Sequence, residues 1–120
     1  MIEVTLPWPS SKLNPNARVH FREKAAQART YREACHYLTL PEKRHLPDGD
    51  LRLELTFYPP DKRARDRDNL LSSMKSGLDG VAQALGIDDS RFEPVVVSVA
   101  RQIGGMVKVR IVPRETLETV

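Results

Sequence analysis

Hydrophobic and polar residues alternate along several stretches of the chain, and this period of two is typical of half-buried β-strands. Residues 2–7 (IEVTLP) and 51–58 (LRLELTFY) show it, and each stretch runs into prolines that end a strand. A β-branched run at 94–100 and an alternating segment at 106–112 predict two more strands. The glycine pair at 104–105 predicts that these last two strands form a hairpin.

Two other stretches repeat their apolar residues with the helical period of 3.6. In residues 21–40 the apolar positions on one face are Ala26, Tyr31, Ala34, Cys35 and Leu38. In residues 69–85, at 100° per residue, the apolar positions fall within an arc of roughly 80°. These positions are Leu70, Met74, Leu78, Val81 and Leu85. Gly86 is well placed to end this second helix.

The predicted order is strand, helix, strand, helix, strand, strand, which indicates an α+β (mixed α/β) fold. We expect one mixed four-stranded sheet with two main helices packed against it. A chain of 120 residues fits a single domain, 1–120, with residues 114–120 as a mobile tail. No stretch approaches the roughly 20 apolar residues that cross a bilayer, and the N-terminus does not resemble a signal peptide. We therefore expect a cytoplasmic protein with no membrane contact. The single cysteine, Cys35, is expected to be structural.

The charge is distributed unevenly along the chain. Nineteen Lys and Arg stand against sixteen Asp and Glu, a net charge of +3. Four acids form two tight pairs, Asp66 with Asp68 and Asp88 with Asp89. A basic surface around a metal-binding acidic pocket suits a protein that holds a polyanion against metal ions.

The first acidic pair lies between a predicted strand and a predicted helix. Asp66 and Asp68 are separated by one residue, so their carboxylates can converge on one cation where the backbone turns. Magnesium prefers hard oxygen ligands and keeps several waters, so two or three carboxylates complete a site. Asp89 follows the helix that Asp68 precedes and is the natural third ligand. The chain must fold back after Gly86 for these residues to meet.

A second interpretation exists for each acidic pair. Asp68 or Asn69 could cap the second helix, and Asp88, Asp89 and Ser90 could form an ordinary turn. Each pair alone favours these structural roles. Together, and directly after a basic loop, they favour a metal site.

Lys75 lies about two turns along the helix from Asp68. With Asp79 these residues project within an arc of roughly 40°, away from the apolar positions. The lysine could hold a scissile phosphate, or it could form a weak surface ion pair with Asp79. The spacing favours neither interpretation over the other.

Basic residues surround the candidate site. Residues 61–67 (DKRARDR) carry four cations, and the helix at 21–40 has a basic face that fits solvent or phosphate equally well. We expect DNA contacts from Lys62, Arg63, Arg65, Arg67, Arg18 and Arg32. Motifs of other chemistries are absent from the sequence: there is no GxSxG, no zinc-ligand spacing and no P-loop.

Four motifs then give the sequence a family resemblance. LPWP at 6–9, YRE at 31–33, DKRARDRDNL at 61–70 and GIDDS at 86–90 resemble, in the same order, the RusA family of Holliday-junction resolvases. The DxDN with a following lysine and a later DD is the most specific part. The family consists of homodimeric, magnesium-dependent endonucleases that resolve four-way DNA junctions by paired symmetric nicks in recombination and repair. Many members are encoded by phages or prophages.

The resemblance implies that Asp66, Asp68 and Asp89 are the metal-binding catalytic carboxylates and that Lys75 is the catalytic lysine. It implies Mg²⁺ as cofactor, with Mn²⁺ able to substitute, and four-way junctions and a second copy of the chain as partners. Residues expected beside the metal are Asp88, Asn69 and Asp79. The family's lysine follows the second aspartate by about one turn, whereas Lys75 follows Asp68 by seven residues. The spacing here is longer by about three residues, which is close to one helical turn, so Lys75 would still face the same side of the helix as the family's lysine.

Two other functions fit the same residues. One is a metal-dependent nuclease that prefers flaps or forks. The other is a protein that binds branched DNA without cutting it, although such a protein gains nothing from three aspartates that face phosphates.

Overall fold

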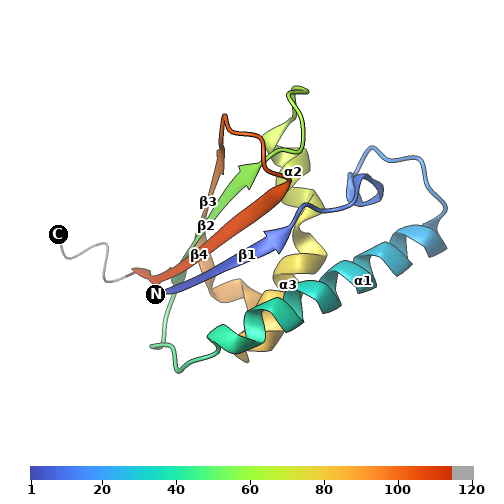
Figure 1. Ribbon diagram of the computed structural model, residues 1–120. Coiled ribbons are helices and arrows are strands. Elements are labelled where there is room, and N and C mark those ends of the chain that lie inside the picture. Colours follow the sequence, from blue (N-terminus) through green and yellow to red (C-terminus); the bar gives the residue numbers. More distant parts are fainter. Residues whose placement is uncertain (115–120) are drawn as a thin grey trace.

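A four-stranded mixed sheet forms one layer of the computed structural model, and the helices pack together against one of its faces (Figure 1). The strands are β1 (Ile2–Pro7), β2 (Leu51–Tyr58), β3 (Phe92–Val99) and β4 (Met106–Pro113), in the spatial order β1-β4-β2-β3. β4 is antiparallel to both of its neighbours, and β2 and β3 are parallel. This confirms the predicted α+β fold with a mixed four-stranded sheet.

The expected hairpin between the last two strands is wrong. β4 pairs with β1 and β2, whereas β3 lies on the other side of β2 at the edge of the sheet. Burial does not separate a central strand from an edge strand here. Val107, Val109 and Ile111 of the central strand β4 are almost fully buried, but so are Ile2 and Leu6 of the edge strand β1. Both arrangements share the same local pattern, so the sequence alone could not distinguish them.

The structure describes residues 1–114, and most of the expected mobile tail lies outside them. Arg114 is the residue of that tail that the structure describes, and it contacts Asp50. Its backbone N–H donates to the carbonyl of Asp50, and its guanidinium pairs with the Asp50 carboxylate at 3.1 Å. None of the helices within residues 1–114 is long and apolar enough to span a membrane.

The helical layer contains α1 (Phe21–Thr39), α2 (Arg67–Ser73) and α3 (Lys75–Leu85). The single helix predicted at 69–85 begins two residues earlier and is interrupted at Met74, whose φ of −87° and ψ of −7° depart from α-helical values. The side chain of Met74 is fully buried, so the interruption lies against the core. Short 3-10 helices occur at Ser11–Leu13, Leu40–Glu42 and Asp89–Arg91.

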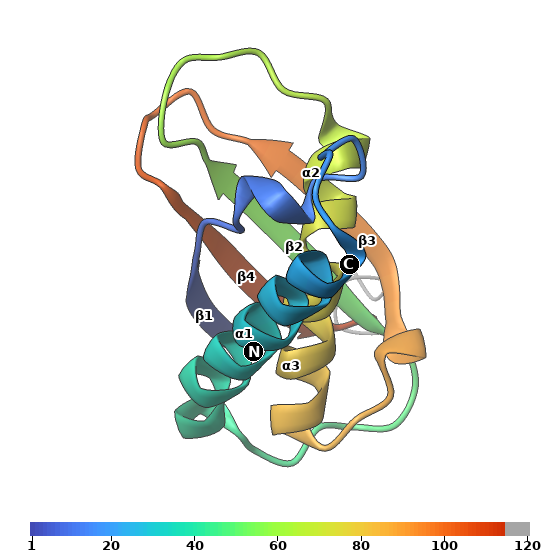
Figure 2. The same cartoon turned by 90° about the vertical axis from the view of Figure 1, so that its right-hand side faces the viewer.

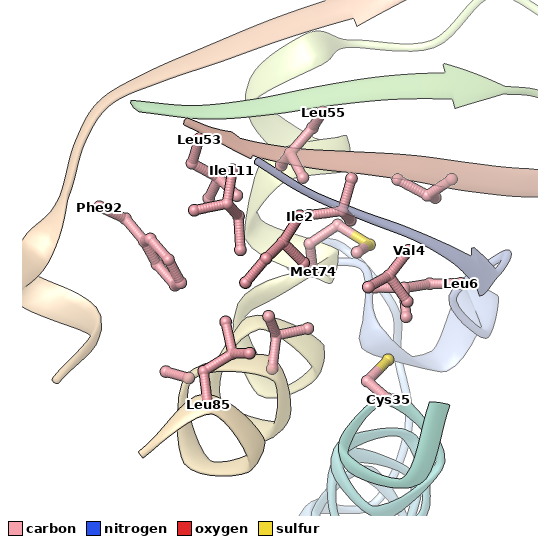
Figure 3. Close-up of a cluster of buried hydrophobic side chains, with 14 of the residues drawn as sticks. Ile2, Val4, Leu6, Cys35, Leu53, Leu55, Met74, Leu85, Phe92 and Ile111 are labelled. Carbon is pink, nitrogen blue, oxygen red and sulfur yellow. The ribbon is translucent and has the colours of Figure 1, made fainter. Parts of the chain in front are cut away.

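The core lies between the helices and the sheet (Figure 3). Odd-numbered residues of β2 and β4 and even-numbered residues of β1 point into it, as their alternation predicted. The apolar positions predicted for the second helix are all buried or partly buried. On α1 the prediction holds for Tyr31 and Cys35, but Leu38 is 47% exposed. Burial raises the pKa of the Cys35 thiol to about 12, which fits its expected structural role.

Helices α1 and α3 cross at very close range because glycine occupies the contact. A Cβ on Gly80 would lie 2.2 Å from the carbonyl oxygen of Arg32, and one on Gly77 would lie 2.5 Å from the ring of Tyr31. The Tyr31 hydroxyl donates a 2.7 Å hydrogen bond to the carbonyl of Pro7, at the end of β1. These contacts fix α1 and α3 relative to the end of β1, and Figure 2 shows the two helices side by side over the sheet.

Candidate active site

Asp66 caps helix α2. Its Oδ1 accepts hydrogen bonds from the backbone N–H groups of Asp68, at 2.8 Å, and Asn69, at 3.4 Å. The capping role considered for Asp68 or Asn69 therefore belongs to Asp66. Both bonds use one oxygen, and Oδ2 accepts no hydrogen bond from any residue in 1–114. Capping and binding a cation are therefore compatible at this carboxylate.

Asp68 lies exposed in the first turn of α2, next to the half-buried Asn69. It extends the acidic end of the helix toward solvent, where negative charge is also favoured by the helix dipole. Within the described part of the chain, no three Asp, Glu, His or Cys side chains are placed to hold one metal ion. Asp66, Asp68 and Asp89 are thus not grouped around a single point.

Asp89 instead lies close to Asp79 of α3. Gly86, with a φ of +69°, ends α3 in the left-handed conformation and turns the chain back along the helix. The Asp79 and Asp89 carboxyl groups then lie close enough for the charge of one to affect the other. Burial, followed by the neighbouring Asp89, raises the pKa of Asp79, while Lys75 and Arg32 act in the opposite direction.

The closeness of Asp79 and Asp89 was not predicted. The sequence placed Asp79 four residues after Lys75, a spacing that indicates a Lys75–Asp79 neighbour on one helix but says nothing of Asp89. The fold-back that the metal hypothesis required does occur, but it brings Asp89 to the middle of the helix rather than to its beginning.

Asp88 has the structural role that the turn interpretation described. Its Oδ1 accepts a 2.8 Å hydrogen bond from the backbone N–H of Ser90 and caps the 3-10 helix Asp89–Arg91. That hydrogen bond lowers the pKa of the Asp88 carboxyl. Because Asp88 is turned toward its own backbone, Asp89 is the carboxylate of this pair that reaches another element.

Lys75 is the exposed first residue of α3 and lines a cleft of about 270 Å³ between α1 and the end of α2. Arg32, on α1, and Asp79 line the same cleft. The hydroxyl of Ser76, also on its wall, is buried without a hydrogen-bond partner among the described residues. The structure thus places Lys75, Arg32 and Asp79 together, with Asp89 close to Asp79.

Asp66 and Asn69 line a neighbouring cleft of about 330 Å³, which shares Ser73 with the first. Its wall includes Trp8, the tryptophan of the LPWP motif, and the guanidinium of Arg65 lies over the Trp8 ring. The two clefts separate the acidic start of α2 from the Lys75 cluster, with one serine side chain common to both.

The expected DNA-binding residues divide into two groups. Lys62, Arg67 and Arg18 are exposed, and Arg63 is 85% exposed although it pairs with Asp61 at 3.2 Å. Arg65 is only 19% exposed, and Arg32 is partly buried beside α3. Exposed cations can reach a phosphate backbone without rearrangement, whereas Arg32 and Arg65 reach solvent only through the clefts that they line.

Comparison with known proteins identifies a relative. An uncharacterized protein of Xylella fastidiosa (strain Temecula1 / ATCC 700964) is 45% identical over 113 residues, which cover 89% of this chain and 74% of that protein. The chain belongs to that protein's family. No protein-family model matches the sequence. The family assignment thus rests on a relative matched over most of both proteins and carries no activity with it.

Proposed function

We propose that this protein is a Mg²⁺-dependent, structure-specific DNA endonuclease that resolves Holliday junctions by paired symmetric nicks in DNA recombination and repair. The observation that carries the proposal is the cleft that Lys75, Arg32 and Asp79 line together, with the Asp89 carboxyl group close to that of Asp79. Two ionised carboxylates close together repel each other, and a divalent cation between them removes that repulsion. Lys75 and Arg32 beside the pair supply the positive charge that a phosphate requires.

The donor chemistry of these residues fits magnesium, which takes hard oxygen ligands and keeps several waters. The resemblance to RusA implies that Asp66, Asp68 and Asp89 would hold it. These three are not grouped around one point, and the carboxylate that lies near Asp89 is that of Asp79. The free Oδ2 of Asp66 leaves that residue able to bind a cation while it caps α2. Bound Mg²⁺ would activate water and neutralise charge on the scissile phosphate.

The cationic side chains have separate roles in this proposal. Lys75, exposed at the start of α3, holds the scissile phosphate and stabilises the charge that grows on it. Arg32 is held against α3 and keeps a positive charge beside Asp79. Exposed residues of the basic loop, such as Arg63 and Arg67, bind neighbouring phosphates and contribute affinity rather than rate.

Paired nicks require two sites, and one domain of this size supplies one. We therefore propose a homodimer with two-fold symmetry, matched to the symmetry of a four-way junction. The same activity on cellular DNA places the protein in the cytoplasm. Sedimentation at assay concentrations should show a dimer, and a stable monomer with full activity would contradict this part of the proposal.

A cleavage assay tests the function directly. A labelled four-way junction, a fork, a flap and a linear duplex are each incubated with Mg²⁺ or with EDTA. We expect the wild type to make symmetric nicks in the junction with Mg²⁺ only. Asp68→Asn and Asp89→Asn should still bind the junction but should not cut it. Asp88→Asn, which keeps the turn-capping amide oxygen, is the matched control and should retain cleavage. Preferred cutting of flaps or forks, or binding without cutting, would overturn the proposal in favour of the corresponding alternative.

A further inference from the structure

The loop that follows β2 and the loop that joins β3 to β4 lie at the same end of the sheet (Figures 1 and 2). Residues of both loops line a groove of about 430 Å³. We call it the cationic groove. The charged residues that line it are Lys62, Arg63, Arg65, Arg67, Arg101 and Asp61. Five cations against one carboxylate leave four uncompensated positive charges in one groove, more than the net charge of the whole chain.

Both walls of the groove are held in place. The backbone N–H groups of Ala100, Gly104 and Gly105 donate to the carbonyls of Phe57, Pro59 and Tyr58, which ties the 100–105 loop to the end of β2. The opposite wall is braced by Asp61 and Arg65. Asp61 accepts the backbone N–H of Arg63 at 2.9 Å and pairs with the Arg65 guanidinium, also at 2.9 Å. The groove is therefore preorganised, which lowers the entropy cost of binding.

The cations of the groove differ in whether they pair with a carboxylate. Arg63 and Arg65 share Asp61, whereas Lys62, Arg67 and Arg101 are exposed and make no ion pair with any residue in 1–114. Ile103, 53% exposed, adds an apolar side chain at the rim. Exposed cations beside an apolar rim suit an extended, hydrated polyanion with sugars between its phosphates, rather than a small anion that needs an enclosing pocket.

The open face of the sheet provides a contrast on the same molecule. Lys108, Arg110 and Arg52 lie there with Glu3 and Glu54, so three positive side chains stand beside two negative ones. Arg110 pairs with Glu54 at 3.4 Å and with Glu3 at 3.9 Å. Positive charge is thus largely compensated on the sheet and left uncompensated in the cationic groove. The groove also ends at Arg67, between Asp66 and Asp68, so a polyanion lying in it reaches the acidic start of α2.

We propose that the cationic groove binds the sugar–phosphate backbone of a duplex arm of DNA and that Arg101 is a phosphate-binding residue. This inference rests on the proposed function, since it names where the backbone of that function's substrate lies. Arg101 lies far along the sequence from the basic loop, and the 100–105 loop carries it to the opposite wall. Cations on both walls of the groove therefore contact the DNA backbone, from two sides.

Fluorescence anisotropy with EDTA present, so that nothing is cut, tests the groove separately from catalysis. A labelled junction and a labelled duplex are titrated with wild type, Arg101→Ala, Arg101→Glu and Lys43→Ala over a range of salt concentrations. Lys43 is the matched control because it is an exposed lysine that precedes β2, at the opposite end of that strand. Arg101 is exposed, so thermal melts should show that its variants fold as wild type.

We expect Arg101→Ala to weaken binding of both DNAs roughly tenfold near 0.1 M salt and to flatten the log–log salt slope by about 0.9. Arg101→Glu should weaken it further, and Lys43→Ala should match wild type. If Arg101→Ala binds as wild type while wild type still cuts junctions with Mg²⁺, the groove proposal fails and the proposed function stands. An equal loss in Lys43→Ala, or tighter binding of duplex RNA, also overturns it. If wild type neither binds nor cuts DNA, both proposals fail.

Discussion

The guanidinium of Arg65 lies over the indole ring of Trp8, with 5.3 Å between the guanidinium carbon and the ring centroid. Its N–H groups also donate to the carbonyls of Asp61 and Arg63, at 3.3 and 3.0 Å. Phe57 packs edge-on against Trp8, so the stack connects the basic loop to the core. Arg65 therefore serves to hold the loop, whereas the sequence led us to expect a phosphate contact.

Arg65→Ala should lower the free energy of unfolding by about 1–2 kcal/mol, because it removes the stack on Trp8, the ion pair with Asp61 and both backbone hydrogen bonds. Arg63→Ala, at a side chain 85% exposed, should change stability by less than about 0.5 kcal/mol and should weaken DNA binding instead. Urea unfolding followed by Trp8 fluorescence measures the first effect, and anisotropy measures the second. Equal stability losses in the two variants would contradict this division.

Gly80→Ala should destabilise the protein despite the better helix propensity of alanine. The gain in propensity is about 1 kcal/mol, but the new methyl group would lie 2.2 Å from the backbone oxygen of Arg32, and overpacking of this kind costs about 1–3 kcal/mol or more. Neither helix backbone can move without disturbing the core. Gln83→Ala, at an exposed position of α3, is the control and should be neutral or stabilising. Thermal melts of the two variants decide the sign.

Asp79→Asn should raise the melting temperature at neutral pH and lose that advantage in acid. A raised pKa in the folded state means that the fold favours protonated Asp79, so its stabilising contribution is present below the unfolded pKa and is lost as pH rises through the folded one. Asparagine avoids the repulsion from Asp89 at neutral pH. Melting curves of the variant and the wild type, recorded from about pH 3 to neutral pH, test this. Added Mg²⁺ should narrow the difference at neutral pH by stabilising the wild type.

Lys75→Ala should reduce the single-turnover cleavage rate by about 10²–10³-fold, because its charge stabilises a phosphate that becomes more negative in the transition state. Binding affinity should change little, since one exposed lysine among many contributes a small share of the ground-state attraction. Saturating protein removes any binding contribution from the measured rate. A variant that cuts at the wild-type rate would show that Lys75 is a surface lysine and that Lys62 or Arg67 holds the phosphate.

Local patterns predicted most of the elements but not how they pair. The alternation in residues 2–7 and 51–58 located β1 and β2 with their observed bounds, and the helical period located α1 to within a residue. The glycine pair at 104–105 favoured a hairpin, because turn chemistry describes neighbours in sequence only. Its actual partners are the carbonyls at 58 and 59, which a local pattern cannot indicate. The interruption at Met74 was also missed, since a methionine in a regular apolar pattern shows no break.

For the candidate site, the sequence indicated which residues to consider, but it could not indicate which of them lie near one another in the fold. The sequence predicted Asp66 as a metal ligand and Asp88 as a residue beside the metal, and these stay predictions. The structure shows that both cap short helices, a role that spacing alone could not assign to one aspartate over the next. The closeness of Asp89 to Asp79 depends on where the chain returns after Gly86, which is a property of the packed fold. Arg101 was missed for the same reason, because no sequence signal links it to a loop forty residues earlier.

The position of β4 between β1 and β2 affects how the protein is made. Among the described strands, β1 pairs only with β4, in a register that joins Ile2 to Ile111 and Pro7 to Met106. β1 is therefore synthesised long before its partner, and contacts of such wide sequence separation form slowly. Until β4 is made, β1 has no hydrogen-bonded neighbour among the described strands, and β2 lacks one of its two. Residues 106–113 thus join two parts of the sheet that do not otherwise pair.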